Sequence, residues 1–416
     1  MAKNEQARTY GGLRVLIAGG GVAGLEALLA LRALAADLVD IELLAPEPHF
    51  WYRPLAVTEP FDAGRAHHFE LAEIAESAAA AFTLGQLSSV DADARIARTS
   101  HGAEIHYDAL VIACGALPRA WLPGALTFRG PADSDAYRLL LAEAASGAIG
   151  SIVFTAPPTG VWPLPLYELA LQTATHLAER DGHVKLALVT PEPEPLSLFG
   201  DAAGKAIREL LSSHGVSLHT ASYAVRYDAG MLELVPQSTL AAERVVSLPR
   251  LEGLPILGIP QDAHGFIATD LSARVAGFSG VYAAGDITQF PIKQGGIAAQ
   301  QADAAAESIA AQAGAAVQPQ PFQPVLRGVL LTGRTPRYLR NEPHGGRGDV
   351  GTVAAEALWW PPGKIVGRYL APFLARFGGL DVPSPAGDVG ALELEIDLRD
   401  HPANFGRDSV VHRKRQ

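Results

Sequence analysis

The sequence predicts an α/β protein built from two nucleotide-binding folds, and three observations lead to this prediction. A short apolar run, Val15 to Ala18, leads through a glycine-rich turn into a helix-forming run. A second unit begins at residue 151, and its second strand closes with Pro-Glu-Pro as in the first unit, LALVTPEP at 186–193 against IELLAPEP at 41–48. A late strand of small residues, Val281 to Ala284, runs into Gly285-Asp286. Strands alternating with helices indicate parallel sheets, and the internal echo favours a duplicated fold.

The composition excludes several classes of function. The formal net charge of −11 argues against a nucleic-acid surface, which needs clustered Lys and Arg. A single cysteine rules out an internal disulfide, a dithiol redox pair and a multi-cysteine metal site, so we expect no metal. The first ten residues are polar and no apolar run reaches 18 residues, so we expect neither a signal peptide nor a membrane-spanning helix. The expected compartment is the cytoplasm.

The turn after the first strand, GGGVAG at 19–24, has the G-x-G-x-x-G spacing of a dinucleotide site in its required strand–helix context. Gly19 suits the tight turn, Gly21 allows the backbone to approach a pyrophosphate, and Gly24 allows the helix to pack closely on the strand. The phosphates would lie on the free N–H groups of the helix N-terminus. The candidate cofactor-binding residues of this turn are Gly19, Gly21, Val22, Ala23 and Gly24.

The second predicted strand, Asp40 to Leu44, is followed by Glu47, which is our candidate for the ribose contact. Next comes HFWYRPL at 49–55, three aromatic residues beside Arg53. Aromatic walls could exclude water from a flavin ring here, and Arg53 could stabilise the anionic form of a reduced flavin. Aromatic packing beneath a loop remains an equal alternative for these side chains.

Two further turns suit the same cofactor. Residues 86–112 predict a meander that ends on a buried strand, Ala109 to Ala113, followed by Cys114-Gly115-Ala116. In the late Gly285-Asp286 turn, the carboxylate suits a ribityl hydroxyl near a flavin pyrophosphate. The following helix, from about Gly295-Gly296 to Ala311, would direct its positive end at the flavin's pyrimidine edge.

Together, the GxGxxG turn, LVIACGALP at 110–118 and GVYAAGD at 280–286 resemble the FAD-dependent pyridine nucleotide–disulfide oxidoreductase superfamily. Over roughly residues 13–320, the chain is most similar to the branch of type II NADH dehydrogenases, sulfide:quinone reductases and flavocytochrome c sulfide dehydrogenases. The resemblance implies two Rossmann-like three-layer domains, the second inserted in the first, plus a C-terminal α+β extension. The implied limits are 1–130 with 262–320 for the FAD-binding domain, 131–261 for the NAD(P)-binding-like domain, and 321–416 for the extension.

The resemblance also carries over residues. It implies that FAD contacts the first glycine turn together with Cys114, Gly115, Ala116, Gly285, Asp286 and Gly296. Cys114 stands where the family usually has threonine, and a thiol is a poorer hydrogen-bonding group. Lys293, just before the late helix, could reach the flavin N1–C2=O edge. Gln300 and Gln301 resemble the glutamines of a quinone-site helix, with an ordinary solvated position on a helix as the alternative.

The second nucleotide loop departs from both branches of the family. VFTAPPTGV at 153–161 aligns with the NADH-binding loop of the dehydrogenases, but Thr155-Ala156-Pro157 replace three glycines and weaken an NADH site. In the sulfide-oxidising branch, Trp162 occupies the place of a redox cysteine, so disulfide chemistry is excluded. Both branches have a glutamate at the position of Glu168, near the flavin or the nicotinamide. Glu168 and Lys293 are the catalytic candidates; for Glu168, an ordinary helix-N-terminal acid is the alternative.

The C-terminal residues include a hairpin-like run, Pro324 to Leu331, and an apolar stripe within 358–377 that predicts an amphipathic helix. Trp359 and Trp360 lie just upstream, as interfacial anchors would. Two interpretations stay open: peripheral contact with the inner face of the cell membrane, or packing on the FAD domain. In either case Pro372 is expected to bend or break the helix.

These observations lead to a two-electron flavoenzyme that passes electrons from a small-molecule donor through FAD to a quinone-like or other acceptor. NAD(P)H is the favoured donor on family grounds, although the loop at 155–157 argues against it. One alternative is a cysteine-less sulfide:quinone reductase-like enzyme with another small donor. Another is a flavin-binding sensor or partner protein without turnover. The oligomeric state stays open, with a homodimer among the options.

Overall fold

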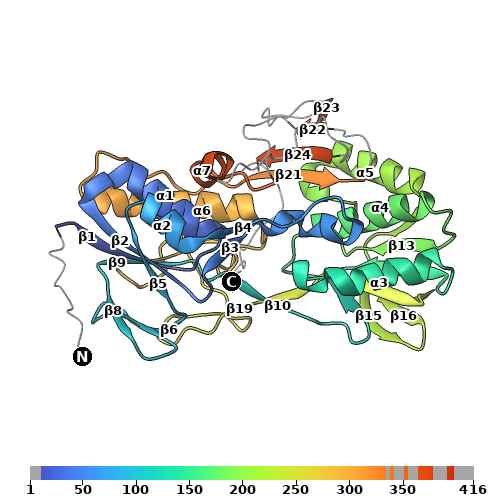
Figure 1. Cartoon of the computed structure of the whole chain (residues 1–416), viewed down its shortest axis with the longest axis horizontal. Coiled ribbons are helices and arrows are strands. Elements are labelled where there is room, and N and C mark those ends of the chain that lie inside the picture. Colours follow the sequence, from blue (N-terminus) through green and yellow to red (C-terminus); the bar gives the residue numbers. More distant parts are fainter. Residues whose placement is uncertain (1–10, 334–337, 342–350, 355–363, 378–390, 398–416) are drawn as a thin grey trace, which may run out of the picture.

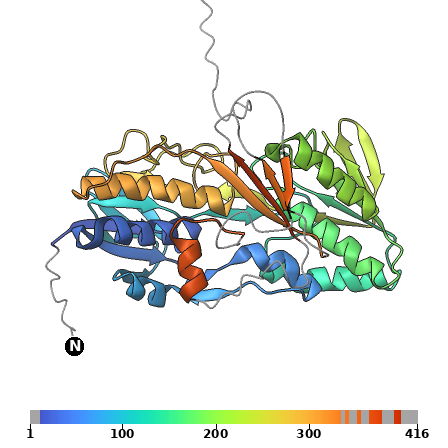
Figure 2. The ribbon, with the colours of Figure 1, turned by 90° about the horizontal axis from the view of Figure 1, so that it is seen from above.

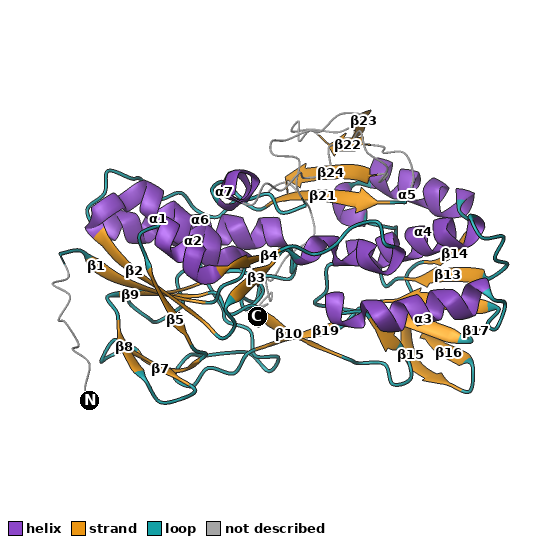
Figure 3. Ribbon diagram, in the orientation of Figure 1, coloured by secondary structure: helices purple, strands orange, loops and turns teal. Residues whose placement is uncertain are grey.

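The computed structural model describes residues 11–333, 338–341, 351–354, 364–377 and 391–397. Two α/β lobes lie side by side along the longest axis, and the C-terminal strands lie across the top of the second lobe (Figure 1). In the first lobe the helices lie above the central sheet in this view, and a smaller antiparallel sheet lies below it (Figure 3).

The first lobe is built on a parallel sheet of five strands in the order β20-β9-β1-β2-β5. Its late strand is hydrogen-bonded to β9, so residues far apart in the chain complete one sheet. The strands are β1 (Leu13–Ala18), β2 (Val39–Ala45), β5 (Ala81–Leu84), β9 (Ala109–Ile112) and β20 (Val281–Ala283). After the second sheet, the chain therefore returns to the first lobe and adds β20 to its sheet.

Two long helices of the first lobe, α1 (Val22–Ala35) and α6 (Gly295–Gln312), pack together on one face of this sheet (Figure 2). Leu25, Leu28 and Leu31 of α1 are fully buried there. The predicted meander lies on the other side as β6 (Leu87–Asp91), β7 (Ile96–Thr99) and β8 (Glu104–His106). The smaller elements are η1 (Ala36–Leu38), β3 (His49–Trp51), η2 (Arg53–Phe61), β4 (His68–Glu70) and α2 (Leu71–Ser77).

The second lobe repeats the architecture with a parallel sheet in the order β11-β18-β12-β13-β14. The strands are β11 (Leu126–Thr127), β12 (Ser151–Thr155), β13 (Lys185–Val189), β14 (Val216–His219) and β18 (Arg244–Ser247). Its helices are η3 (Pro131–Asp133), α3 (Ser134–Ala145), α4 (Leu164–Ala178), η4 (Ser197–Phe199) and α5 (Asp201–Ser213), and β15 (Tyr223–Asp228), β16 (Met231–Val235) and β17 (Ser238–Ala241) form a small antiparallel sheet. The predicted α/β fold class with two Rossmann-like domains is confirmed.

The lobes are joined by two antiparallel strands, β10 (Ala116–Arg119) and β19 (Arg250–Gly253), which run between them (Figure 1). β11 already pairs with β18 of the second sheet, although it lies within the range 1–130 expected for the first domain. The exact domain limits therefore stay a prediction, with the chain passing between the sheets at residues 116–126 and 247–253.

The C-terminal extension contributes strands to the second lobe. β21 (Val325–Leu331) pairs antiparallel with β24 (Ala391–Asp397), and β22 (Tyr338–Asn341) pairs with β23 (Gly351–Ala354). The hairpin-like prediction for Pro324 to Leu331 is wrong, because this run is one strand whose partner lies about 60 residues later. Residues 334–337, 342–350 and 398–416 lie outside the described residues.

The helix expected within 358–377 is shorter than predicted. α7 (Leu370–Phe377) begins only after Ile365 and Val366, and Trp359 and Trp360 lie outside the described residues. Pro372 does not break it, because a proline in the first turn of a helix has no intrahelical partner to lose. Leu370 and Leu374 join the core of the first lobe beside α1. Among the described residues no helix is both long and apolar enough to span a bilayer.

Candidate functional site

In the turn between β1 and α1, Gly19 and Gly24 are required by close packing of the backbone, whereas Gly21 leaves open space for a ligand. Gly19 has φ +135°, and a Cβ there would lie 2.1 Å from the Ala113 carbonyl oxygen. A Cβ on Gly24 would lie 1.8 Å from the Gly19 carbonyl oxygen. A Cβ on Gly21 would meet nothing within 4 Å. The space beside Gly21 is therefore open, and nothing in the described fold requires glycine there.

The N-terminus of α1 offers free hydrogen-bond donors at this open side. The first backbone N–H of the helix with an acceptor is that of Leu25, which donates to the Gly21 carbonyl at 2.9 Å. Within the described residues, the N–H groups of Val22, Ala23 and Gly24 have no acceptor, and no acidic side chain caps the turn. Unpaired N–H groups at the positive end of a helix bind phosphate. The residues present therefore fit a dinucleotide pyrophosphate.

The turn after β9 lies beside the glycine turn. The Cys114 thiol donates to the Ala18 carbonyl at 3.3 Å, which ties the ends of β9 and β1 together. Burial raises the pKa of Cys114 to about 12, so the thiol stays protonated and is a poor nucleophile. Gly115 has φ +70°, and a Cβ there would meet nothing within 4 Å. Contacts of Cys114, Gly115 and Ala116 with FAD remain a prediction.

The Gly285-Asp286 turn, which follows β20, lies against the N-terminus of α1. A Cβ on Gly285, which has φ +82°, would lie 3.0 Å from the Cβ of Ala23 in the first turn of α1. The Gly285 N–H donates to Gln301 Oε1 at 2.8 Å, and Thr288 Oγ1 donates to the Gly285 carbonyl. Gln301 therefore positions the turn from α6. Sequence reasoning had considered only a quinone-site or solvated role for this glutamine.

Asp286, Lys293 and Arg53 form a charged group at this turn. Lys293 Nζ donates to the carbonyl oxygens of Asp286 and Thr288 and lies 3.8 Å from the centre of the Phe266 ring. Burial lowers the pKa of Lys293 to about 8, against the opposing effect of the Asp286 charge. Burial raises the pKa of Asp286, against the positive charges of Lys293 and Arg53. The predicted carboxylate and both predicted cations thus share one electrostatic environment.

The N-terminus of α6 adds positive potential. Gln294 caps the helix, because its Oε1 accepts from the Ile297 N–H at 3.0 Å, and its Nε2 donates to the Arg327 carbonyl. The N–H groups of Gly295 and Gly296 have no acceptor in the described part of the chain. Gln300 instead bonds both backbone groups of Val325, so it fastens β21 to α6.

In the run from His49 to Leu55, Phe50 and Tyr52 pack inside the protein, whereas Arg53 lies near Asp286. Phe50 is buried and stacks on Phe69 with ring centres 6.2 Å apart, and the buried Tyr52 hydroxyl accepts from the Ile365 N–H. Packing therefore accounts for these two aromatic residues. Glu47 is exposed just beyond β2, where the ribose contact was expected, and that role stays a prediction.

Glu168 lies in α4 as a fully buried carboxylate. Its two oxygens lie 2.6 and 2.8 Å from Lys364 Nζ, and Oε1 also accepts from the Leu331 N–H at 2.8 Å. Lys364 Nζ donates in addition to the Pro54 carbonyl. The predicted catalytic acid thus joins segments from three parts of the chain, and its catalytic role stays a prediction.

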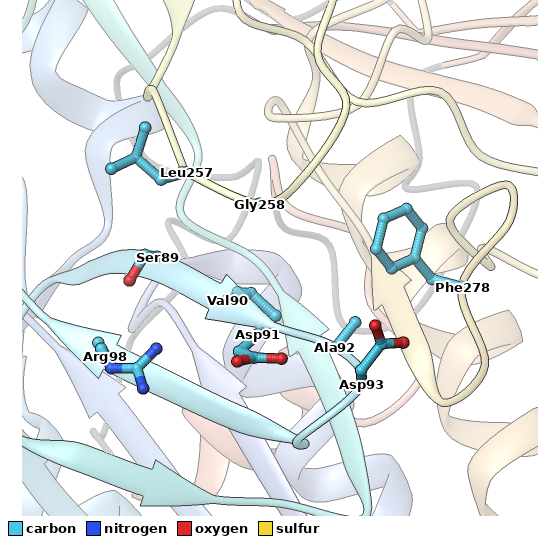
Figure 4. Close-up of a pocket in the computed structure, with 9 residues that line it drawn as sticks. All are labelled: Ser89, Val90, Asp91, Ala92, Asp93, Arg98, Leu257, Gly258 and Phe278. Carbon is cyan, nitrogen blue, oxygen red and sulfur yellow. The ribbon is translucent and has the colours of Figure 1, made fainter.

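Two surface depressions lie away from these turns. One, of about 410 Å³, has Asp91, Asp93 and Arg98 beside Leu257 and Phe278 (Figure 4). The other, of about 590 Å³, lies around the opposite ends of β1 and β2 and is lined mostly by apolar residues, with three carboxylates (Asp40, Glu42 and Glu76) beside Arg14 and His106. Neither contains a residue of the predicted site.

Comparisons with known proteins agree with this geometry. Residues 13–155 match the sequence family described as pyridine nucleotide-disulphide oxidoreductase. An NADH dehydrogenase-like protein of Mycobacterium tuberculosis is 27% identical over 293 residues, which cover 66% of this chain and 72% of the relative.

The solved structures show the same fold. The sulfide:quinone oxidoreductase of Aquifex aeolicus has a TM-score of 0.68 at 19% identity, over 77% of this chain and 81% of that one. A ferredoxin reductase of Rhodopseudomonas palustris has a TM-score of 0.57 at 20% identity, over 79% and 85%. NDH2 of Plasmodium falciparum in complex with NADH has a TM-score of 0.54 at 14% identity, over 66% and 64%. Residues 13–155 thus match the pyridine nucleotide-disulphide oxidoreductase family, and over a longer span the chain is similar to NADH dehydrogenase-like proteins and shares the fold of sulfide:quinone oxidoreductase.

Proposed function

We propose that this protein is an FAD-dependent oxidoreductase that passes two electrons from a reduced donor through FAD to a quinone or other acceptor. One observation carries the proposal: three free N–H groups of α1 border the open space at Gly21, and the Gly285-Asp286 turn packs against the same helix end. FAD bound there would supply the two-electron chemistry.

The residues of the chain have distinct parts in this proposal. The α1 N-terminus binds the pyrophosphate, Glu47 binds the ribose hydroxyls, and the Asp286 carboxylate accepts from a ribityl hydroxyl. Lys293, Arg53 and the α6 N-terminus contribute positive charge, which favours a reduced, anionic flavin. Because its pKa is about 8, Lys293 can hold or release a proton at Nζ near neutral pH.

Donor and acceptor are less closely constrained than the cofactor. The name of the mycobacterial relatives supports NAD(P)H as donor, and the likeness to the Aquifex sulfide:quinone oxidoreductase supports a quinone as acceptor. A peripheral membrane contact through 358–377 would involve Phe377, which is exposed at the end of α7 and stacks on Phe373 with ring centres 4.9 Å apart. A homodimer remains one possible assembly.

A second candidate is a cysteine-less relative of sulfide:quinone oxidoreductase that oxidises another small donor. It is favoured by Trp162, which stands at the place of the redox cysteine and packs edge-on against Phe199. The protein keeps the shape of that enzyme without its thiol chemistry.

The test starts from the purified protein, with its absorption spectrum and its ratio of FAD to polypeptide. The flavin is reduced anaerobically with dithionite and then mixed with a soluble quinone, and the flavin absorption band is followed. We expect one FAD per chain and reoxidation by the quinone. Failure to bind FAD even after reconstitution contradicts the proposal. Bound flavin that no quinone or soluble electron acceptor reoxidises identifies a flavin-binding protein without turnover.

A further inference from the structure

We infer that the second nucleotide fold of this chain does not hold a pyridine dinucleotide, so that neither NADH nor NADPH reduces the flavin from this lobe. The statement about flavin reduction rests on the proposed function, whereas the statement about the second lobe rests on the structure alone. Four features of the second lobe support it.

The first feature is the length of the loop between strand and helix. In the first lobe, only residues 19–21 separate β1 from α1, and Gly24 lies within the helix against the strand. In the second lobe, residues 156–163 separate β12 from α4. Gly160, the glycine that corresponds to Gly24 in the first lobe's motif, has φ +70°, and a Cβ there would meet nothing within 4 Å. It therefore allows the loop to turn and does not bring a helix close to a strand. The phosphate-binding turn of the first lobe is therefore not reproduced.

The second feature is the start of α4, where prolines remove the anion-binding donors. Pro163 is the N-cap residue and Pro165 is the second helical residue, and neither has an N–H. The Leu166 N–H donates to the Pro163 carbonyl at 2.9 Å. Of the first three helical residues, only Leu164 keeps an uncommitted N–H among the described atoms. α1 offers three such groups, so the pyrophosphate site exists in one lobe and not in the other.

The third feature is the acid after β13, at the place where a nucleotide fold holds the ribose hydroxyls. Glu192 Oε2 accepts from the Tyr167 hydroxyl at 2.6 Å and from Thr190 Oγ1 at 2.9 Å. Its Oε1 is buried and has no partner in the described residues. Glu192 is half-buried, with one carboxylate oxygen bonded to its own fold and the other out of contact with solvent, so the acid is not presented to a ribose.

The fourth feature is the C-terminal strand that lies against this loop. β21 packs on α4, and the two views agree that it lies beside that helix (Figures 1 and 2). A Cβ on Gly328 of β21 would lie 3.1 Å from the Phe199 ring and 3.6 Å from the Trp162 ring. Leu331, at the end of β21, donates its N–H to Glu168 of α4. The loop that would bind a pyrophosphate thus serves as a packing surface for the C-terminal strand.

The test uses the FAD-saturated holoprotein, so that the first site is filled. NADH and NADPH are titrated by isothermal titration calorimetry, and each is mixed anaerobically with the oxidised protein while the flavin band is followed. We expect no saturable binding up to about 1 mM, the upper end of common KM values, and no saturable bleaching. Dithionite must bleach the same sample, which shows that the flavin is reducible.

Saturable binding of either nucleotide, or bleaching at a rate that saturates with nucleotide concentration, would overturn the inference while supporting the proposed flavin function. Failure of the proposed function is seen separately, because FAD content and quinone reoxidation of the dithionite-reduced protein are measured without NADH or NADPH. A Tyr167→Phe variant, which removes the hydroxyl bonded to Glu192, serves as a check on the third feature. It is also expected to show no binding, because the loop and the helix start remain unchanged. Tight nucleotide binding by this variant would contradict the argument from the loop.

Discussion

Glu168 and Lys364 form a buried ion pair, and burial disfavours the charged form of each side chain when its partner is absent. Burial raises the pKa of Glu168 and lowers the pKa of Lys364, and in each case the partner's charge opposes the shift. The pair persists because the Leu331 N–H and the Pro54 carbonyl complete the hydrogen bonds of the two groups. Removing one charge leaves the other buried without compensation.

A Glu168→Gln variant is therefore expected to lose about 3–5 kcal/mol of unfolding free energy, the usual cost of breaking a buried pair. The measurement is chemical denaturation at neutral pH. The matched control is the double variant Glu168→Leu with Lys364→Met, which removes both charges and should recover most of the loss. If the single variant is as stable as the wild type, the pair does not stabilise the fold as described.

At this scale the sequence identified one partner and missed the other. Glu168 was recognisable from its place in a family motif, whereas Lys364 lies 196 residues away in the sequence and nothing in its local pattern indicates this partner. Likewise, Gln301 was visible as a polar residue on a helix, but its bond to Gly285 depends on how α6 packs. Local patterns locate polar residues, and tertiary packing decides their partners.

Among the elements, α7 is held at its N-terminus by a carboxylate from α1. Glu26 is fully buried, and its oxygens accept from the N–H groups of Tyr369 and Leu370 at 2.7 Å each. Gly367 allows the approach, because a Cβ there would lie 2.3 Å from Glu26 Oε2. Asp303 of α6 shares a hydrogen bond with Glu26. The anion at a helix N-terminus fastens α7 to the first lobe.

This arrangement predicts a pH-dependent stability. Burial raises the pKa of Asp303 to about 8, with the charges of Glu26 and Glu307 adding to the effect and Arg368 opposing it. Burial also raises the pKa of the neighbouring Tyr369, so its hydroxyl stays neutral over this range. The folded protein therefore holds a proton that the unfolded chain releases near pH 4. The stabilisation is complete below that pH and is lost as pH rises toward 8.

Between pH 5 and pH 8 the unfolding free energy should fall with a slope of up to about 1.4 kcal/mol per pH unit from this group. Asp303→Asn mimics the protonated side chain and should flatten that part of the profile. Denaturant titrations at several pH values compare the two proteins. An unchanged slope in the variant would show that Asp303 is not the group that takes up the proton.

The element scale also shows where periodicity misled. A stripe repeating every four residues predicted one helix through Ile365 and Phe377, but only Leu370–Phe377 is helical. Ile365 is buried and non-helical, and its N–H donates to Tyr52. For the buried strands the prediction was accurate: Asp40 to Leu44 lies within β2, and Ala109 to Ala113 extends β9 by one residue.

For the whole molecule, the duplication read from the sequence is confirmed as two parallel sheets with the same architecture. The lobes differ in the property that matters for binding. One retains three free N–H groups at a glycine turn, and the other has two prolines and an internally bonded acid at the corresponding places. The replaced glycines were visible in the sequence, but the lengthened loop and the covering strand β21 became evident only in three dimensions.

The central claim, that FAD lies on the first glycine turn, is tested most directly by Gly21→Ala. Because a Cβ at Gly21 meets nothing within 4 Å and its φ of −90° suits alanine, the apoprotein should lose no more than about 1 kcal/mol of unfolding free energy. The same methyl group would crowd a pyrophosphate, so the dissociation constant for FAD should rise at least about tenfold, or 1.4 kcal/mol. Gly11→Ala, also in open space but before β1, is the control and should change neither quantity. Fluorescence titration of the apoproteins with FAD provides the comparison. Equal affinity of Gly21→Ala and wild type, with the fold intact, would contradict the account.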